Sequence, residues 1–261
     1  MNSMKTNGPG RLRYLTARRW AQRVGFWPLV IVFLLGGAKG NAALLSFGSG
    51  TLNTAIPDND ANGITSGIAV SGQTDLISDV TVTLNLSALG GAGFNGDIYA
   101  YLTHDTINGF AVLLNRPGRS ASNSIGTDGS GFSNVTFDDA ATNGDVHLYE
   151  MTLGGGFNAG DALTGTWAPD GRNVDPANVL DTDNRSAFLS SFDGQVPNGN
   201  WSLFVADLSS GGTLRLDDWS LGLTVSPVPE PHHALVVALG LGWFALRRRR
   251  TNGATKREGE V

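Results

Sequence analysis

The sequence of 261 residues contains no cysteine. This absence excludes a small scaffold held together by disulfide bonds, but it does not argue against export, because a secreted domain with a large hydrophobic core is stable without them. With 41% hydrophobic residues, the chain is long enough for one sizeable core or two small ones. The 36 glycines and the lack of a long helical periodicity favour an all-β fold.

Lysine is absent between residues 44 and 226, and this segment is strongly acidic. It carries five arginines against 20 acidic residues, a formal net charge of −15, and every acid except Glu150 is an aspartate. The other 13 basic residues lie in 1–42 and 227–261. Such an acidic surface repels phosphate backbones, so nucleic acid is not an expected partner. Aspartate is also the acid that suits tight turns and hard cations.

Long apolar runs occur only near the two ends of the chain. Residues 1–25 are basic and polar, 26–37 read FWPLVIVFLLGG, and small residues follow in AKGNAA. This order is typical of a secretory signal peptide and predicts one at residues 1–43, cleaved after Ala42 or Ala43. The alternative is an uncleaved N-terminal anchor, which the short apolar run disfavours because a membrane span needs about 20 residues.

The second apolar run lies within VPEPHHALVVALGLGWFALRRRR, residues 228–250. From Pro231 to Leu246 it has 16 uncharged residues, and an α-helix of that length spans about 24 Å of a bilayer core that is about 30 Å thick. Arginine side chains after the run can snorkel to the interface, and by the positive-inside rule they keep the tail at 251–261 in the cytoplasm. We therefore predict a C-terminal transmembrane helix in the precursor, followed by Arg247, Arg248, Arg249 and Arg250.

The order of parts at 227–250 resembles a PEP-CTERM sorting signal. A Val-Pro-Glu-Pro motif at Val228, Pro229, Glu230 and Pro231 precedes the apolar helix and the arginine cluster. The two prolines keep Glu230 extended and outside the following helix, which presents it to a processing enzyme. The resemblance implies recognition and cleavage by an exosortase, and a place on the cell surface or in the exopolysaccharide matrix of a Gram-negative bacterium. A plain C-terminal anchor is the alternative.

Strict alternation of apolar and polar residues dominates the segment 44–226. In VTVTLNL, residues 80–86, the apolar positions share one face, and the same period recurs in 97–103, 201–205 and 219–225. Glycine, asparagine and aspartate cluster between these runs in 89–96, 126–131 and 196–200, as is typical of turns. The pattern predicts seven to nine antiparallel strands in a β-sandwich of jelly-roll type.

Eight blocks of this segment resemble, in order, the P domain (Homo B) of subtilisin-like proprotein convertases. They are residues 56–72, 77–87, 96–105, 112–118, 135–141, 163–171, 189–207 and 216–225. The resemblance implies a jelly-roll β-sandwich of galactose-binding-like topology. We expect no protease activity, because only about 13 residues separate the predicted signal peptide from the first block.

Two groups of aspartates are candidate calcium ligands. DNDANG at 58–63 places Asp58 and Asp60 as in the first half of an EF-hand loop, but Ala69 stands where that loop needs glutamate. A turn held by Asx side chains is the alternative. The resemblance to P domains implies structural calcium, with ligands that correspond here to Asp97, Asp138 and Asp139. For the last two, a turn without metal is again the alternative.

Catalytic motifs are absent from the sequence. His104 and His147 lack metal-binding spacing, no Gly-x-Ser-x-Gly elbow occurs, and we interpret both histidines as surface or strand-end residues. Among the tryptophans, Trp201 and Trp219 lie in alternating strands and are expected in the core. Trp167, in the loop-like TGTWAPDG, is the candidate for contact with a sugar.

The sequence is compatible with three functions. We expect a non-catalytic exported protein of the cell surface or extracellular matrix, sorted by its C-terminal signal. The first alternative is an accessory domain that stabilises or targets a separate serine protease. The second is a carbohydrate-binding protein of the exopolysaccharide matrix.

Overall fold

The computed structural model describes residues 41–227. Most of the predicted signal peptide, the sorting motif at 228–231, the C-terminal helix and the tail lie outside these residues. None of the helices between residues 41 and 227 has the length and apolarity that a membrane crossing requires.

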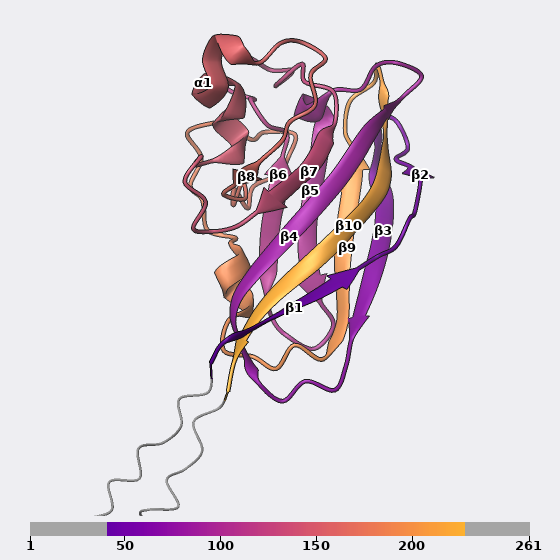
Figure 1. Cartoon of the computed structure of the whole chain (residues 1–261). Coiled ribbons are helices and arrows are strands. Elements are labelled where there is room, and N and C mark those ends of the chain that lie inside the picture. Colours follow the sequence, from indigo (N-terminus) through magenta and orange to yellow (C-terminus); the bar gives the residue numbers. More distant parts are fainter. Residues whose placement is uncertain (1–40, 228–261) are drawn as a thin grey trace, which may run out of the picture. The chain divides into compact units, whose positions relative to one another are not determined.

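The described part of the chain is built from two β-sheets (Figure 1). In the first sheet the strand order is β1-β10-β4-β7-β8, with β2 paired to β10, and in the second it is β3-β9-β5-β6. The strands of the first sheet are β1 Ala43–Gly48, β2 Thr54–Ala55, β4 Leu76–Leu89, β7 Phe132–Phe137, β8 Thr166–Trp167 and β10 Thr213–Ser226. Those of the second are β3 Asp60–Val70, β5 Ile98–His104, β6 Phe110–Asn115 and β9 Gly199–Asp207.

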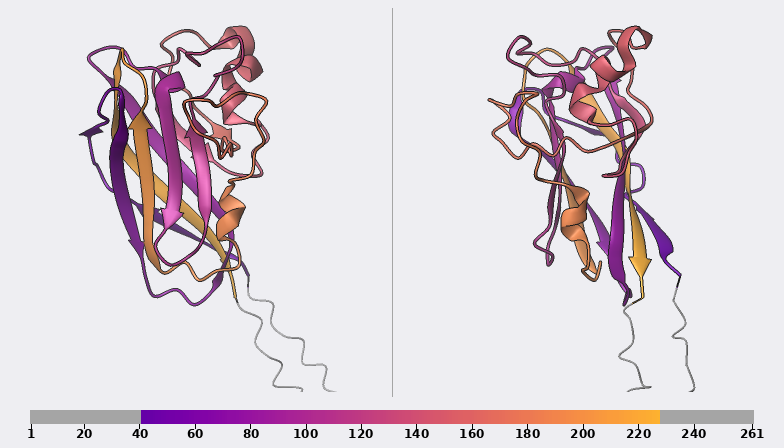
Figure 2. Two further views of the ribbon diagram at one scale, coloured as in Figure 1. Left: turned by 180° about the vertical axis from the view of Figure 1, so that it is seen from behind. Right: turned by 90° about the vertical axis from the view of Figure 1, so that its left-hand side faces the viewer.

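The two sheets face each other as separate layers, as the edge-on view of Figure 2 shows. Every pairing between strands is antiparallel except that of β7 with β8, which is parallel. The prediction of an all-β fold with mainly antiparallel strands is therefore confirmed.

The alternating runs of the sequence form the long central strands. The 80–86 run lies in β4, where Val80, Val82, Leu84 and Leu86 are buried between the sheets while the residues between them are half-buried. The 219–225 run forms the end of β10, which pairs with β4 along most of its length. The period of two thus set which face of each strand points inward, because burying one face fixes the register of the strand.

The core between the layers is apolar and includes three tryptophans. Trp201 and Trp219 are buried, as expected from their places in β9 and β10. Each indole N–H keeps a hydrogen-bond acceptor, the carbonyl of Pro197 at 3.0 Å for Trp201 and the hydroxyl of Ser66 at 2.9 Å for Trp219.

Loops and short helices cover one end and one edge of the sandwich (Figures 1 and 2). Only one short α-helix, α1 at Tyr149–Leu153, occurs between residues 41 and 227. The 3-10 helices are η1 Asn95–Asp97, η2 Val146–Leu148, η3 Gly154–Gly156 and η4 Leu189–Phe192. Between β8 and η4 the chain runs from 168 to 188 without a helix or a named strand, and scattered backbone hydrogen bonds, such as those of Asp170 and Gly171 to β6, act together with side chains to hold it in place.

Candidate functional site: an aromatic groove on a buried polar network

The outer face of the second sheet carries a cluster of aromatic side chains. Tyr99 and Tyr101 alternate along β5 with Ile98, Ala100 and Leu102, which are fully buried in the core. Because successive side chains of a strand point to opposite faces, both tyrosines point away from the core.

These tyrosines contact Phe204 of β9, the partner strand. Tyr101 lies directly opposite Phe204 in the strand register, and their rings stack with centroids 4.7 Å apart and planes 18° apart. Tyr99 packs edge-on against Phe204 at 6.3 Å, and Phe110 of β6 lies 5.3 Å from Tyr101 on the far side. These four aromatic residues are half-buried, and apolar side chains that gather on the outer face of a sheet are candidates for a site of interaction.

Tyr99, Tyr101 and Phe204 form the floor of a groove of about 500 Å³. At the β3 side the groove is lined by Ala61 and Leu208, and at the β6 side by the loop 175–177. The volume lies within the range of about 300–1,000 Å³ that is typical of small-molecule sites.

Arg116 lines the same groove from the residue after β6. Its backbone φ is +49°, in the left-handed region that a residue with a long side chain adopts at a cost of about 1–2 kcal/mol. The guanidinium donates to the carbonyl of Gly96 and forms an ion pair with Asp97, whose Oδ1 lies 3.3 Å from Nη2. Arg116 is 8% exposed, and its Nη1 makes no hydrogen bond within residues 41–227. Arg116, which lines the groove, therefore keeps one donor without a partner among the described residues.

The loop wall of the groove is fixed by side chains of the β6 end. Arg119 Nη1 donates to the carbonyls of Pro176 and Ala177 at 2.8 and 3.1 Å. The Asn115 amide donates to the carbonyls of Arg172 and Val174. The segments 115–119 and 172–177, far apart in sequence, are thereby held side by side.

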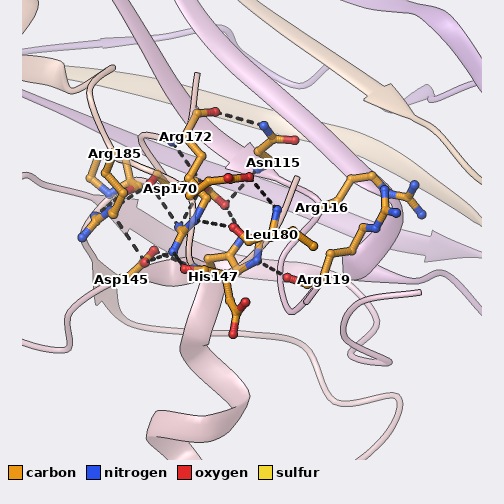
Figure 3. A network of polar contacts seen from close by, with 12 residues as sticks. Asn115, Arg116, Arg119, Asp145, His147, Asp170, Arg172, Leu180 and Arg185 are labelled. Carbon is orange, nitrogen blue, oxygen red and sulfur yellow. Dashed lines mark hydrogen bonds and ion pairs between the residues drawn. The ribbon is translucent and has the colours of Figure 1, made fainter. Parts of the chain in front are cut away.

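A buried network of charged side chains lies behind these two segments (Figure 3). His147 Nδ1 lies 2.7 Å from Asp170 Oδ2, with both side chains fully buried. Arg172, itself 2% exposed, donates to Asp170 Oδ1 at 3.1 Å and to Asp145 Oδ2 at 2.8 Å. The other ring nitrogen of His147 lies 2.9 Å from the carbonyl of Arg119, which connects the network to the groove.

The electrostatics of the network explain why its charges tolerate burial. Burial by itself lowers the pKa of His147, but the hydrogen bond and the charge of Asp170 outweigh burial, so the pKa lies above its usual value. Arg172 also donates to the carbonyls of Leu180 and Asp181, and Arg185 to those of Pro169 and Asp170. The network thus adds side-chain hydrogen bonds to the few backbone hydrogen bonds that join the irregular segment 168–188 to β6.

Three aspartates near Arg116 influence one another electrostatically. Asp97 in η1 and Asp207 at the end of β9 are both buried, while Asp58 is exposed. Burial in the first place, and then the charges of Asp97 and Asp58, raise the pKa of Asp207 to about 6. Burial is also the main cause that raises the pKa of Asp97, and the charge of Asp58 adds to it against the opposing effect of Arg116.

Asp207 is incompletely satisfied. Its Oδ1 accepts a hydrogen bond from the backbone of Ser209 at 3.2 Å, whereas the buried Oδ2 has no partner in the described part of the chain. Sequence reasoning named Asp58 and Asp97 as candidate ligands but placed them in separate groups, and it missed Asp207. The structure brings the three together because Asp207 pairs in register with both Ile98 and Asp60.

The other predicted calcium ligands are used by the protein itself. Asp138 Oδ1 accepts from the backbone of Ala140, and Asp139 accepts from the backbones of Leu189 and Ser190 at the start of η4. Asp60 accepts from the backbone and the side chain of Asn62. Asp138 and Asp60 thus form the Asx-type turns named as alternatives, whereas Asp139 binds the start of η4, which is distant in the sequence. No group of three or more histidine, cysteine, aspartate or glutamate side chains is arranged as a ready-made metal site between residues 41 and 227.

Two residues lie in environments that differ from the sequence expectation, and a third meets the expectation of a strand end. Trp167 is 1% exposed and its indole donates to the carbonyl of Thr164 at 2.8 Å, so no ring face is open to a sugar. His147 is fully buried rather than at the surface. His104 does end strand β5 as expected, but it is buried against Trp201, with ring centroids 4.8 Å apart.

No family model matches the sequence, and no curated protein shows a significant match. Among solved structures, the serine protease of Aeromonas sobria in complex with its chaperone is similar at 12% identity and a TM-score of 0.38, over 72% of this chain and 28% of that chain. The serine protease of Aeromonas sobria solved by itself gives 15% identity and a TM-score of 0.37, over 71% and 27%. The present chain therefore corresponds to little more than a quarter of either structure, and TM-scores below 0.5 assign neither fold nor activity.

Sequence reasoning missed the aromatic groove. The signal was present in part, since Tyr99, Tyr101 and Phe204 occupy the positions between the apolar residues of two alternating strands. Large aromatic residues at expected solvent-facing positions were a sign of a binding surface. The closing of the groove by Arg116 and the loop 175–177 depends on contacts between distant segments and has no signature in the sequence.

Proposed function

We propose that residues 44–226 form a non-catalytic binding module that is exported to the cell surface or extracellular matrix. The observation that carries this proposal is the groove on the second sheet, where an aromatic floor and a buried guanidinium with a free donor are held by an internal network of charges. Concave aromatic sites with a few fixed polar groups are the usual architecture of ligand sites.

The polar groups of the groove suit binding rather than bond cleavage. Arg116 is a permanent cation and does not act as a base. Asp175, the carboxylate of the groove, accepts hydrogen bonds from the backbone of Ala177 and the amide of Asn178, which fix the loop turn. His147, the titratable group of the network, is closed off from the groove by its own hydrogen bonds.

A matrix-retention experiment tests the proposal. The mature domain, residues 44–226, is mixed with extracellular matrix isolated from the bacterium that produces it, and the bound fraction is measured after washing. A binding module is retained, and Phe204→Ala reduces retention at least tenfold while Thr103→Ala, on the same outer face of β5 beyond the groove, leaves it unchanged. Equal retention of all three proteins, or of none, would contradict the proposal.

The export route is proposed from the sequence at the two ends. The signal peptide at 1–43 directs the chain across the membrane, and the motif Val228, Pro229, Glu230 and Pro231, with its helix and arginine cluster, sorts it through an exosortase. Mass spectrometry of the protein purified from its host fixes both ends. We expect a start near residue 43 and an end close to the motif, and a mature chain that retains residues 247–250 would contradict the sorting step.

The same domain has a second candidate role as an accessory of a separate serine protease. It is favoured by the eight blocks that resemble a P domain, all of which fall within the described domain and imply its jelly-roll, galactose-binding-like topology. Affinity purification of the tagged domain from its host distinguishes the two roles. Recovery of a stoichiometric serine protease whose activity or half-life falls without the domain would favour this role over matrix binding.

We also propose that the domain holds structural calcium beside Asp207, with Asp97 and Asp58 nearby and backbone and water oxygens completing the site, since these three carboxylates do not form a ready-made metal site by themselves. The observation that supports the ion is the buried Oδ2 of Asp207, which has no partner within the described residues and whose pKa is raised by burial and then further by the charges of Asp97 and Asp58. Carboxylate and backbone oxygens are the ligands of Ca²⁺, which when bound would neutralise the repulsion between these carboxylates and join the start of β3, η1 and the end of β9. Calcium is less expected at the other three predicted ligands. The carboxylates of Asp138 and Asp60 already accept hydrogen bonds within turns, and that of Asp139 accepts from the start of η4.

A further inference from the structure

We infer that the groove on the second sheet binds a pyranose unit of a neutral polysaccharide, with its apolar C–H face packed against the ring edges of Tyr99, Tyr101 and Phe204. The inference rests on the proposed binding function and names the ligand class of that site. A pyranose ring offers one apolar face and a rim of hydroxyl groups, and the groove offers the matching surfaces.

The floor of the groove fits the apolar face of a sugar ring. Tyr101 and Phe204 stack face to face and Tyr99 inclines toward them, so the three rings present a row of ring edges that forms a continuous apolar surface. Aromatic side chains lose little conformational entropy on binding, and these three already hold one another in place.

The polar groups around the floor fit the hydroxyl rim. Arg116 Nη1 is a donor without a partner in the described domain, and the Tyr99 hydroxyl is a second donor. Burial, in the first place, raises the pKa of Tyr99 to about 12, so this hydroxyl keeps its proton at any physiological pH. Asp175 supplies acceptor oxygens at the loop wall. Sugar hydroxyls both donate and accept, and they can satisfy all three groups.

Charge selects a neutral ligand over a charged one. A cationic side chain in the groove would meet Arg116 at close range in a poorly solvated site. An anionic polysaccharide would meet Asp175 and the field of a segment with a net charge of −15. A neutral sugar incurs neither penalty.

The groove is also organised before any ligand binds. Arg116 is held in the left-handed backbone region by its ion pair with Asp97 and its hydrogen bond to Gly96. Arg119 fixes the loop wall, and the network of His147 and Asp170 fixes Arg119. Strained residues that the surrounding structure holds in place cluster at ligand sites, where they reduce the entropy lost on binding.

Calorimetric titration of residues 44–226 with hexasaccharides tests the inference. The probes are neutral β-1,3- and β-1,4-linked glucose, mannose and galactose oligomers, with an oligomer of guluronate and a proline-rich peptide as comparisons. We expect at least one neutral oligomer to bind, Tyr101→Ala to weaken it about tenfold or more, and Thr103→Ala to leave it unchanged. Tyr101→Phe should retain the affinity within about threefold, because it removes only the hydroxyl and keeps the aromatic ring that contacts the sugar.

The outcomes separate the ligand class from the binding function. If matrix retention depends on Phe204 but no neutral oligomer binds, or if the guluronate oligomer or the peptide binds more tightly, the inference is overturned and the proposed function stands. If matrix does not retain the protein either, both the inference and the proposed binding function are contradicted. Binding of a neutral oligomer that Tyr101→Ala leaves unchanged would place the sugar elsewhere and also overturn the inference.

Discussion

Arg116 and Asp207 show how individual residues of this domain are constrained by burial. Arg116 adopts a backbone conformation that its side chain disfavours, and it does so at the point where its guanidinium reaches both Asp97 and the groove. Asp207 is a buried acid with one oxygen that has no partner among the described residues. Backbone strain at Arg116 and the unpaired oxygen of Asp207 both lower the stability of the folded state. Such costs are typical of functional positions.

Replacement of Asp207 by asparagine should stabilise the metal-free domain at neutral pH. The folded-state pKa of about 6 lies above the usual 3.8, so ionisation of Asp207 at pH 7.5 costs about 2 to 3 kcal/mol of folding free energy. Asparagine removes this cost and keeps an oxygen for the backbone of Ser209. Urea unfolding in EDTA at pH 7.5 and at pH 5 measures the effect, which should be smaller at pH 5. A variant less stable than the wild type at pH 7.5 would contradict this account.

At the scale of elements, the bulge in β3 is the feature that brings this strand close to the groove. The register of β3 with β9 shifts between Asp60 and Ile64, and Gly63 in the bulge has a φ of +49°. A Cβ at Gly63 would overlap the carbonyl oxygen of Val205 and lie 2.9 Å from the ring of Phe204. Glycine is therefore required for the chain to pass β9 at this distance.

Gly63→Ala should destabilise the domain by about 2 kcal/mol or more and weaken ligand binding, because both the backbone strain and the overlap act next to Phe204. Gly67→Ala in the same strand is the matched control. Its added Cβ would lie at ordinary contact distance, 3.7 Å from the carbonyl oxygen of Trp201, and its φ is not in the left-handed region. Urea unfolding of both variants measures the difference, and equal stabilities would show that the bulge can relax.

The buried charges of Asp170, Arg172 and His147 help to hold the segment 168–188 in place. Asp170→Asn should cost about 3 kcal/mol, since it removes the carboxylate paired with buried His147 and leaves Arg172 with Asp145 as its remaining carboxylate. Limited proteolysis should then cut within 168–188 while the sheets remain protected. Asp181→Asn, whose carboxylate makes no hydrogen bond or ion pair in the described part of the chain, serves as the control. Unchanged protease resistance of the Asp170 variant would show that packing alone holds the segment.

At the scale of the whole domain, the dominant electrostatic feature is an excess of acids with raised pKa values. Burial is the first cause for Asp207 and Asp97, and also for Asp79, Asp193 and Glu150. In each case the folded state binds more protons than the unfolded state between the two pKa values, so stability falls as pH rises. His147, whose pKa is also raised, acts in the same direction above pH 6.5, whereas His104, whose pKa is lowered mainly by burial, opposes it.

The melting temperature in EDTA should therefore rise from pH 8 to pH 5.5. Millimolar calcium should raise the melting temperature at pH 8 and reduce this pH dependence, because the ion binds the deprotonated carboxylates and only in the folded state. Differential scanning calorimetry at both pH values, with and without calcium, checks both effects. The melting temperature of the Asp207→Asn protein should no longer respond to calcium. Identical melting curves of the wild type in EDTA and in calcium would contradict the proposed calcium site.

The sequence by itself determined the layers of this domain. Alternation in 80–86, 97–103, 201–205 and 219–225 identified the central strands and their buried faces, because burial of one face of a strand leaves a period of two in the residues. It likewise located Trp201 and Trp219 in the core and the turns between strands. These features are local, so a local pattern is sufficient to find them.

Only the tertiary structure decided where the functional groups meet. The burial of Trp167 and His147, the approach of Asp58 and Asp97 to Asp207, and the closing of the groove by Arg116 and the loop 175–177 all depend on contacts between segments that are distant in the sequence. Strand pairing sets these distances through the register of β9 with β3 and β5. An aspartate at a turn and an aspartate in a buried cluster have the same neighbours along the chain, and they differ only in which other strands the fold places beside them.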